Sequence, residues 1–442
     1  MNPIHYSKYE VESRRLLYAI IGTLVLEGII RKLVPSGLSI IIYFVKDFLC
    51  ILGLYYIASS KLTDAPKQIA KRIKVLIILL YPLLCYNLFI DPILFVWGGK
   101  LYLLYTVTAV LMAIAFPNES RDKFKKFIEF NLLLLVVAVF VGVFQLSLPA
   151  SHWLNQSVDG GSLEAFSAAG ILRISSTFSF TGQYSFFLTF ASAMYFCNFF
   201  LISDLKNHVF NNIWIKMAIG LLLFIGCFST GGKTAVLGML SIVGLGFIFI
   251  GFKNPVFAFK RLIVPVLIFS FVFPLIQILK PEYFAAYTAR SNKSGGSNDD
   301  ILERVIEPFS GLVDGSFFGR GLGVMTNGSD KVSTYAASIR AGGYWTESDF
   351  ATIVWEGGMY LVAVWYGFRL FVIFYSFKVL LRIKDSNYYS AAAFLVAYIF
   401  IIGLTGTLTI QPPIAIYFWI CFGALICIQK FDNFDSQLPI CN

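Results

Sequence analysis

Residues 127–148 read FIEFNLLLLVVAVFVGVFQLSL. A helix that crosses a bilayer needs about 20 consecutive, mostly apolar residues, and this run meets that need with a single acid, Glu129. The rest of the chain has the same character, because 57% of its 442 residues are hydrophobic and 14% are charged. A soluble domain carries about 25% charged residues. The sequence therefore predicts an all-α, polytopic membrane protein.

Further segments of this kind follow one another along the chain. We count twelve candidate spans and expect them to form a single membrane domain, a helical bundle over residues 1–442. The predicted spans are 16–34, 38–58, 73–91, 94–116, 127–148, 182–202, 212–229, 234–252, 261–279, 349–377, 390–411 and 413–430.

The lysines and arginines of the short loops predict the orientation of the bundle. They gather in the N-terminal segment and after the second, fourth, eighth and tenth spans, which all lie on one side if there are twelve spans. Short cytoplasmic loops are enriched in these residues, so we expect both termini in the cytoplasm. The net charge of +10 follows from this pattern, and we expect no nucleic-acid partner.

Two loops on the opposite, external side are long enough to carry function. The larger, 280–348, separates the ninth and tenth spans, and the smaller covers 151–181. Within the larger loop, residues 300–314 have apolar side chains at helical spacing, with Arg304 towards the polar side. This pattern predicts an amphipathic helix that lies in the membrane interface.

Charged residues inside the first two spans predict a buried ion pair. Glu27 and Lys46 are almost equally distant from the turn at 35–37, so they lie at equal depth, where an unpaired charge is costly. Arg31 is on the same helix face as Glu27. The group is either a structural clamp or part of a substrate site.

Cations on the external side are the candidate binding groups. They are Arg173, Lys233, Arg304 and Arg320. Guanidinium groups and the backbone amides of Gly-rich turns both suit phosphate oxygens, and cations on this side run against the usual bias. Plainer explanations exist for two of them, since Arg304 could pair with an acid on its own helix and Lys233 could snorkel to the interface.

Acidic residues cluster where the larger loop returns to the membrane, at Thr346-Glu347-Ser348-Asp349. The spacing of Thr346 and Asp349 is that of a capping box at the start of the tenth helix. Glu347 has no part in that cap and is the candidate general base. No cysteine or histidine pattern has metal-ligand spacing, so we expect neither a metal nor a cofactor.

Three stretches together resemble the O-antigen polymerase and ligase superfamily (Wzy and WaaL type) of bacterial envelopes. One is Arg173-Ile-Ser-Ser-Thr-Phe, and the second is Ser229-Thr-Gly-Gly-Lys-Thr-Ala, with Lys233 where the family has arginine. The third runs from Arg304 through Phe-Gly-Arg-Gly-Leu-Gly at 318–323 to Glu347 and the Glu-Gly-Gly at 356–358. The late position of the large external loop is also similar.

The resemblance implies a GT-C-like, metal-independent glycosyltransferase in the bacterial cytoplasmic (inner) membrane. Its substrate would be undecaprenyl-pyrophosphate-linked oligosaccharide, taken from the membrane lipid, with a chain-length regulator and a flippase as candidate partners. The residues implied for pyrophosphate binding are Arg173, Lys233, Arg304 and Arg320. Glu347 and Arg304 would be catalytic.

The resemblance favours a polymerase of repeat units over two alternatives. Ligases of this superfamily, which transfer polysaccharide to an acceptor such as lipid A core, carry a histidine near the re-entry into the late helix, and the larger loop here has none. The alternative of another class is a flippase or transporter. A transporter built from two similar halves would have its long connection in the middle of the chain, whereas here it is late.

Overall fold

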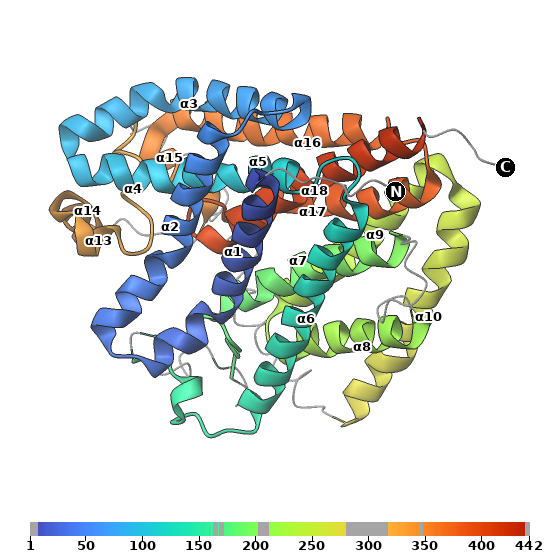
Figure 1. The fold of residues 1–442 in the computed structure, drawn as a ribbon. Coiled ribbons are helices and arrows are strands. Elements are labelled where there is room, and N and C mark those ends of the chain that lie inside the picture. The colour runs from blue at the N-terminus through green and yellow to red at the C-terminus, as the bar shows by residue number, and fades with distance from the viewer. Residues whose placement is uncertain are drawn as a thin grey trace.

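The structure, a computed structural model, describes residues 8–158, 160–161, 167, 172–201, 212–279, 317–343 and 348–437. Within these residues the regular structure is helical and contains no β-strand (Figure 1). Eight helical runs are long and apolar enough to cross a membrane, so the chain is a helical, multi-pass membrane protein. The amphipathic helix expected over 300–314 lies outside the described residues.

The first half of the chain forms two hairpins and two long helices. Its elements are α1 (Lys8–Leu33), α2 (Ser36–Ser59), α3 (Asp64–Ile90), α4 (Pro92–Tyr102), η1 (Leu104–Thr106), α5 (Val107–Ala115), α6 (Arg121–Leu146), η2 (Trp153–Asn155) and α7 (Thr181–Phe200).

The second half has the same helical character. Its elements are α8 (Ile213–Ser229), α9 (Lys233–Lys253), α10 (Pro255–Leu279), α13 (Ser329–Val332), α14 (Thr334–Ala341), α15 (Asp349–Leu361), η5 (Val362–Tyr366), α16 (Gly367–Leu380), α17 (Ser386–Thr405) and α18 (Pro412–Asp435). Each predicted span falls on one or more of these helices. The eleventh, expected over 390–411, ends at Thr405, because Gly406 has extended backbone and a proline pair starts α18.

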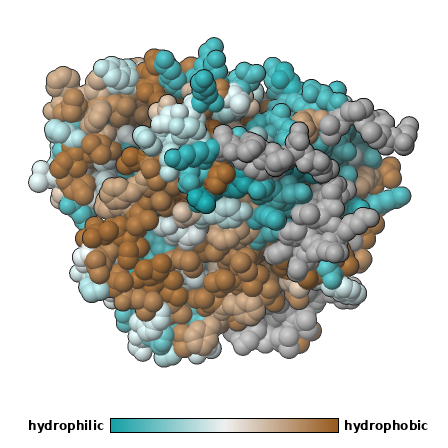
Figure 2. Space-filling view, in the orientation of Figure 1, coloured by the Kyte–Doolittle hydropathy of each residue, from teal (hydrophilic) through white to brown (hydrophobic). Residues whose placement is uncertain are grey.

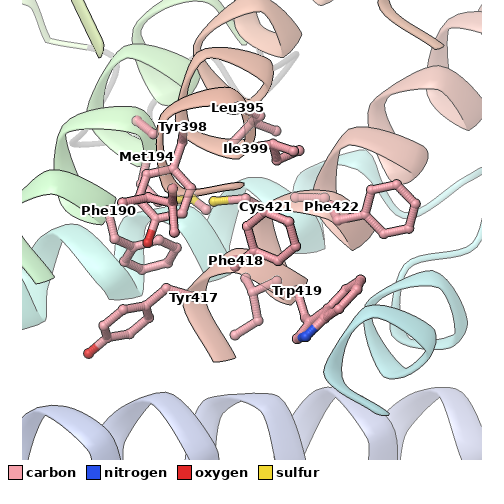
Figure 3. Close-up of a cluster of buried hydrophobic side chains, with 14 of the residues drawn as sticks. Phe190, Met194, Leu395, Tyr398, Ile399, Tyr417, Phe418, Trp419, Cys421 and Phe422 are labelled. Carbon is pink, nitrogen blue, oxygen red and sulfur yellow. The ribbon is translucent and has the colours of Figure 1, made fainter. Parts of the chain in front are cut away.

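The eight candidate spans are α2, α3, α4 with α5, α6, α9, α15 with α16, α17, and α18. Of these, α18 is the most enclosed, with 89% of its membrane window buried, against 28% in α2. Phe190 of α7 stacks on Tyr417 of α18 with ring centroids 4.5 Å apart, and Tyr398 of α17 joins the same cluster (Figure 3). The core therefore lies between α7, α17 and α18.

Outer helices turn apolar side chains to the surroundings. Ile40, Ile41 and Phe48 of α2 are each more than half exposed. Figure 2 shows hydrophobic side chains over the lower left of the visible face, where Figure 1 places the α1–α2 hairpin. Soluble monomers rarely expose apolar patches of this kind, so this face suits lipid.

The turns that carry the short-loop lysines and arginines meet at one end of the bundle, here called the basic end. Lys430 near the end of α18 donates to the Phe116 carbonyl at 2.9 Å, and Arg121 pairs with Asp435 at 3.1 Å. Lys253 at the end of α9 donates to the Ile383 carbonyl at 3.0 Å, in the turn before α17. The grouping of these loops on one side, predicted from the sequence, is therefore present in the fold.

The run from α15 to α16 is broken twice. At Gly358 the backbone has φ 59° and ψ −156°, a left-handed φ that favours glycine, and α15 bends there. Further along the run, Val362–Tyr366 form a π-helical turn. Such turns inside helices are frequent at functional sites, and this one lies in a helix that borders the candidate site.

Candidate functional site

Three non-helical segments meet at the end of the bundle opposite the basic end. They are 172–180, 317–328 and 406–411, and we call them the re-entrant segments. Irregular backbone at membrane depth is tolerated only where protein buries it or where it lines a water-filled cavity. The backbone N–H and C=O groups of these three segments therefore need hydrogen-bond partners, and side chains of the neighbouring helices can supply them.

The first re-entrant segment lies between α1 and α6. Ser176 donates its hydroxyl proton to the carbonyl of Ala138, roughly 12 Å below the end of α6 at 1.5 Å per residue. Gly28 of α1 allows this approach, since a Cβ there would lie 1.9 Å from the Phe178 carbonyl carbon. Lys32 donates to the Ser175 hydroxyl at 2.9 Å. The last part of the 151–181 loop, expected at the external surface, is thus buried in the bundle.

The second re-entrant segment is fastened to α3 and α4. The buried side chain of Asn87 donates to the Leu322 carbonyl and accepts from the Leu322 N–H, both at 2.8 Å. The indole N–H of Trp97 donates to the Thr326 hydroxyl at 2.9 Å. At Gly98 a Cβ would lie 2.6 Å from the Leu322 Cβ, so this close approach requires glycine.

Glu356, fully buried in α15, holds the same segment from its other side. Its Oε1 accepts the Met325 N–H at 2.9 Å and its Oε2 accepts the Tyr102 hydroxyl at 2.7 Å. The glycines at 319, 321 and 323 all have positive φ, and the Gly321 N–H donates to the Glu356 carbonyl at 2.8 Å. Glu356 is therefore an anchor for the Gly-rich turn.

The third re-entrant segment is fixed by a buried ion pair. Arg369 of α16 pairs with Asp349 and donates to the carbonyls of Gly403 and Gly406 at 2.7 and 2.9 Å. Thr409 donates to Asp349 at 3.0 Å. The capping role expected for Asp349 is wrong, because Ser348 is the N-cap residue and the Asp349 carboxylate turns inward to Arg369.

The ion pair predicted between the first two helices is confirmed. Lys46 lies 3.0 Å from Glu27, with both side chains buried, and Arg31 reaches the other oxygen of Glu27 at 3.1 Å. A second buried pair lies beside it, between Asp47 and Lys100 at 2.8 Å. The two acids and three bases of this cluster leave one excess positive charge.

A cavity of about 120 Å³ opens above Lys46. All three re-entrant segments contribute to it, and the amide side chains of Gln183, Asn327 and Gln411 supply polar groups. The full lining is Tyr43, Lys46, Leu101, Phe180, Gln183, Thr326, Asn327, Ile410, Gln411, Pro412 and Pro413. Lys46 is the one charged residue of this lining, and the buried Gln411 Oε1 meets no hydrogen-bond partner among the described residues. Such a site suits an anion that also carries hydroxyl groups.

Three of the predicted pyrophosphate ligands are described, and none of them lines this cavity. Arg320 lies over the Trp355 ring at 4.9 Å, beside the Glu356 anchor. Arg173 is the second residue of the first re-entrant segment, and its buried Nε has no hydrogen-bond partner among the described residues. Lys233 is the first residue of α9. No described contact joins the three to one another.

The two predicted catalytic residues, Arg304 and Glu347, lie outside the described residues. In sequence, Glu347 directly precedes Ser348, the N-cap of α15. The described neighbour Asp349 contacts Thr409 of the third re-entrant segment. The capping partner expected for Asp349, Thr346, also lies outside the described residues.

Sequence reasoning missed Asp47, Lys100, Arg369 and Asn87. Each lies inside the apolar run of a predicted span. Polar and ionisable residues within spans are rare and pair with one another or with carbonyls, so the presence of these four was a usable signal. Their partners were not deducible, because Asp47 and Lys100 are on helices that are not consecutive.

Comparison with known proteins assigns neither a family nor a function to this chain. No protein-family model matches the chain, and no curated protein matches it in sequence.

Proposed function

We propose that this chain polymerises undecaprenyl-pyrophosphate-linked oligosaccharide repeat units into a surface polysaccharide, as a metal-independent glycosyltransferase. The observation that carries the proposal is the cavity where three re-entrant segments meet above Lys46. Membrane proteins commonly build sites for charged substrates from interrupted helices and irregular backbone near the bilayer interior. The one cation and the amides of this cavity supply groups that can bind the phosphate and the hydroxyl groups of such a substrate.

The reaction makes two demands on the site. A hydroxyl oxygen of the next lipid-linked unit attacks the anomeric carbon of the growing chain, the bond from that carbon to the pyrophosphate oxygen breaks, and the hydroxyl proton passes to a base. Charge that develops on the leaving pyrophosphate has to be stabilised by nearby cations. Lys46, Arg173, Lys233, Arg304 and Arg320 are the groups proposed for that task.

Glu347 is proposed as the base that receives the hydroxyl proton. A carboxylate has to come within hydrogen-bond reach of the acceptor hydroxyl to do so. The polymerase reading also takes support from the absence of histidine in the 280–348 loop of the sequence.

The proposal includes an orientation in the membrane. We place twelve spans in the bacterial cytoplasmic membrane, with the basic end and both termini in the cytoplasm, in line with the bias of lysine and arginine towards that side. The cavity then opens on the outer face. A lipid-linked substrate in the outer leaflet can reach the cavity sideways between helices. A flippase would deliver this substrate to the outer face, and a chain-length regulator would act on that same face.

The test is a deletion of the gene, complemented with the wild-type chain. Surface polysaccharide is resolved by length, and lipid-linked saccharides are extracted and sized. A polymerase predicts single repeat units at the surface and no long chains in the deletion strain. Long chains that accumulate on the carrier would identify a ligase, and single units trapped on the cytoplasmic side would identify a flippase.

A further inference from the structure

A second cavity, of about 260 Å³, lies far from the re-entrant segments, between α7, α8, α9 and α10. Its walls are aromatic and aliphatic, and include Phe196, Phe224, Met239, Phe247 and Leu262. The proposed polymerase reaction makes no use of it. A polypeptide interior is normally close-packed, so an apolar space of this size among membrane helices indicates an apolar occupant.

One lining residue differs from the rest. Arg261 of α10 is the single charged group of this lining, and it lies near the start of its helix, which follows the basic-end contact of Lys253. The Arg261 guanidinium lies 5.5 Å from the Phe257 ring centroid, and no carboxylate contacts it among the described residues. A second cation, Lys216, is within electrostatic range of Arg261, and Lys216 also interacts with the carboxylate of Glu129. These two cations exceed the one carboxylate by a single charge, so the mouth of the cavity keeps a net positive charge while its walls are apolar.

We propose that this cavity binds an anionic phospholipid, with one acyl chain between α7, α8, α9 and α10 and the phosphate against Arg261. Apolar walls stabilise an acyl chain in proportion to the methylene groups that they bury, and a guanidinium is suited to phosphate oxygens. Arg261 lies on the basic-end side of the apolar walls. This order matches that of a lipid in the membrane, whose headgroup lies at the surface and whose acyl chain runs towards the bilayer centre.

The position of the charge separates this lipid from the proposed substrate. The pyrophosphate of the lipid-linked saccharide belongs at the opposite end, near Lys46, whereas Arg261 and Lys216 are at the basic end. The occupant is therefore a phospholipid of the leaflet on the basic side. This inference does not depend on the polymerase reaction.

The test is native mass spectrometry of the purified full-length chain, titrated with phosphatidylglycerol or with phosphatidylcholine. Arg261→Ala is compared with Lys260→Ala, an exposed neighbour on the same helix that does not line the cavity. One cation near a membrane surface contributes about 1 kcal/mol, or roughly a fivefold change in affinity. We expect Arg261→Ala to weaken phosphatidylglycerol binding by about that factor, and Lys260→Ala and phosphatidylcholine binding to change little.

A second pair of variants tests the cavity itself. Val243→Phe adds volume within the lining, and Leu237→Phe adds the same ring on an exposed face of the same helix. We expect the first to reduce phosphatidylglycerol binding and the second to leave it unchanged. Equal effects within either pair would overturn the proposal, as would displacement of phosphatidylglycerol by undecaprenyl phosphate at equal concentration.

Discussion

The side-chain amide of Asn87 satisfies both main-chain hydrogen-bonding groups of Leu322, a residue 235 positions later in the chain. The two bonds, each 2.8 Å long, reproduce the pairing that a neighbouring strand would give. Asn87 also donates to the Leu94 carbonyl at 2.9 Å. One side chain thus joins the α3–α4 hairpin to the second re-entrant segment, and so helps to define the cavity.

Replacing Asn87 with leucine should release this segment. The Leu322 N–H and carbonyl would lose their partners in a buried setting, at about 1–3 kcal/mol for each orphaned group. We expect a lower unfolding temperature in detergent and faster thiol labelling of Thr326→Cys in a cysteine-free background. Asn118→Leu, at an exposed turn of the basic end, is the control, and equal labelling rates in the two variants would contradict the anchoring role.

Variants of the Glu27–Lys46 pair can show whether this pair is only a structural clamp or also belongs to a substrate site. Lys46→Met leaves a buried carboxylate with Arg31 alone, and breaking a buried pair costs about 3–5 kcal/mol. The double variant Glu27→Gln with Lys46→Met removes one charge of each sign, so the cluster keeps its single excess positive charge, and the new amide oxygen can still accept from Arg31. This variant should therefore recover most of the stability. If Lys46 contacts the substrate, the double variant folds but makes no long polysaccharide. A stable double variant with normal polysaccharide would show that the pair is only a clamp.

The loss of stability on substitution of Glu356 should depend on how many hydrogen-bond acceptors the new side chain keeps. Glu356→Ala removes the acceptors of the Met325 N–H and the Tyr102 hydroxyl, at about 1–3 kcal/mol each. Glu356→Gln keeps one carbonyl oxygen for Met325, and the Tyr102 hydroxyl can rotate to accept from the amide. We expect a large fall in unfolding temperature for alanine and a small one for glutamine. Similar losses in both would mean that the negative charge itself is required.

Arg173 and Lys233 are two of the four described cations that are proposed to stabilise the leaving pyrophosphate; the others are Lys46 and Arg320. Removing one group that stabilises charge in a transition state commonly costs about 100-fold to 1000-fold in rate. Arg173→Ala and Lys233→Ala should therefore abolish long polysaccharide while protein levels and unfolding temperature stay normal. Lys233→Arg should retain function, since it keeps the charge. Arg382→Ala, at the exposed basic end, is the control expected to behave as wild type.

The proposed orientation predicts which positions an impermeant thiol reagent can reach. In a cysteine-free background, Ser338→Cys in α14 and Asn118→Cys in the turn before α6 are both exposed on the fold. We expect Ser338→Cys to be labelled in intact spheroplasts and Asn118→Cys only after the membrane is opened. The reverse pattern would invert the topology and place the cavity on the cytoplasmic side.

Much of the helical framework was predictable, because each apolar run reports the length of a span. The Glu27–Lys46 pair was predictable too, since the two residues flank one turn and have to lie at one depth. The re-entrant segments were not, because a buried non-helical stretch has no periodic pattern, and four of the nine residues of 172–180 are Ser or Thr, which are common in surface loops. Asn87 and Leu322 meet through a tertiary contact that no local pattern indicates, and so the cavity was not foreseen.

The enclosure of α18 has a consequence for how the protein is made. The ribosome makes this helix after the other seven candidate spans, yet it has the highest buried fraction of the eight, and its Lys430 donates to the carbonyls of Ala113 and Phe116, residues of the first third of this sequence. The seven earlier candidate spans must therefore enter the bilayer before the helix that fills their centre has been made. A stop codon shortly before residue 412 would leave an insertion intermediate, a ready target for membrane proteases, rather than a smaller working protein.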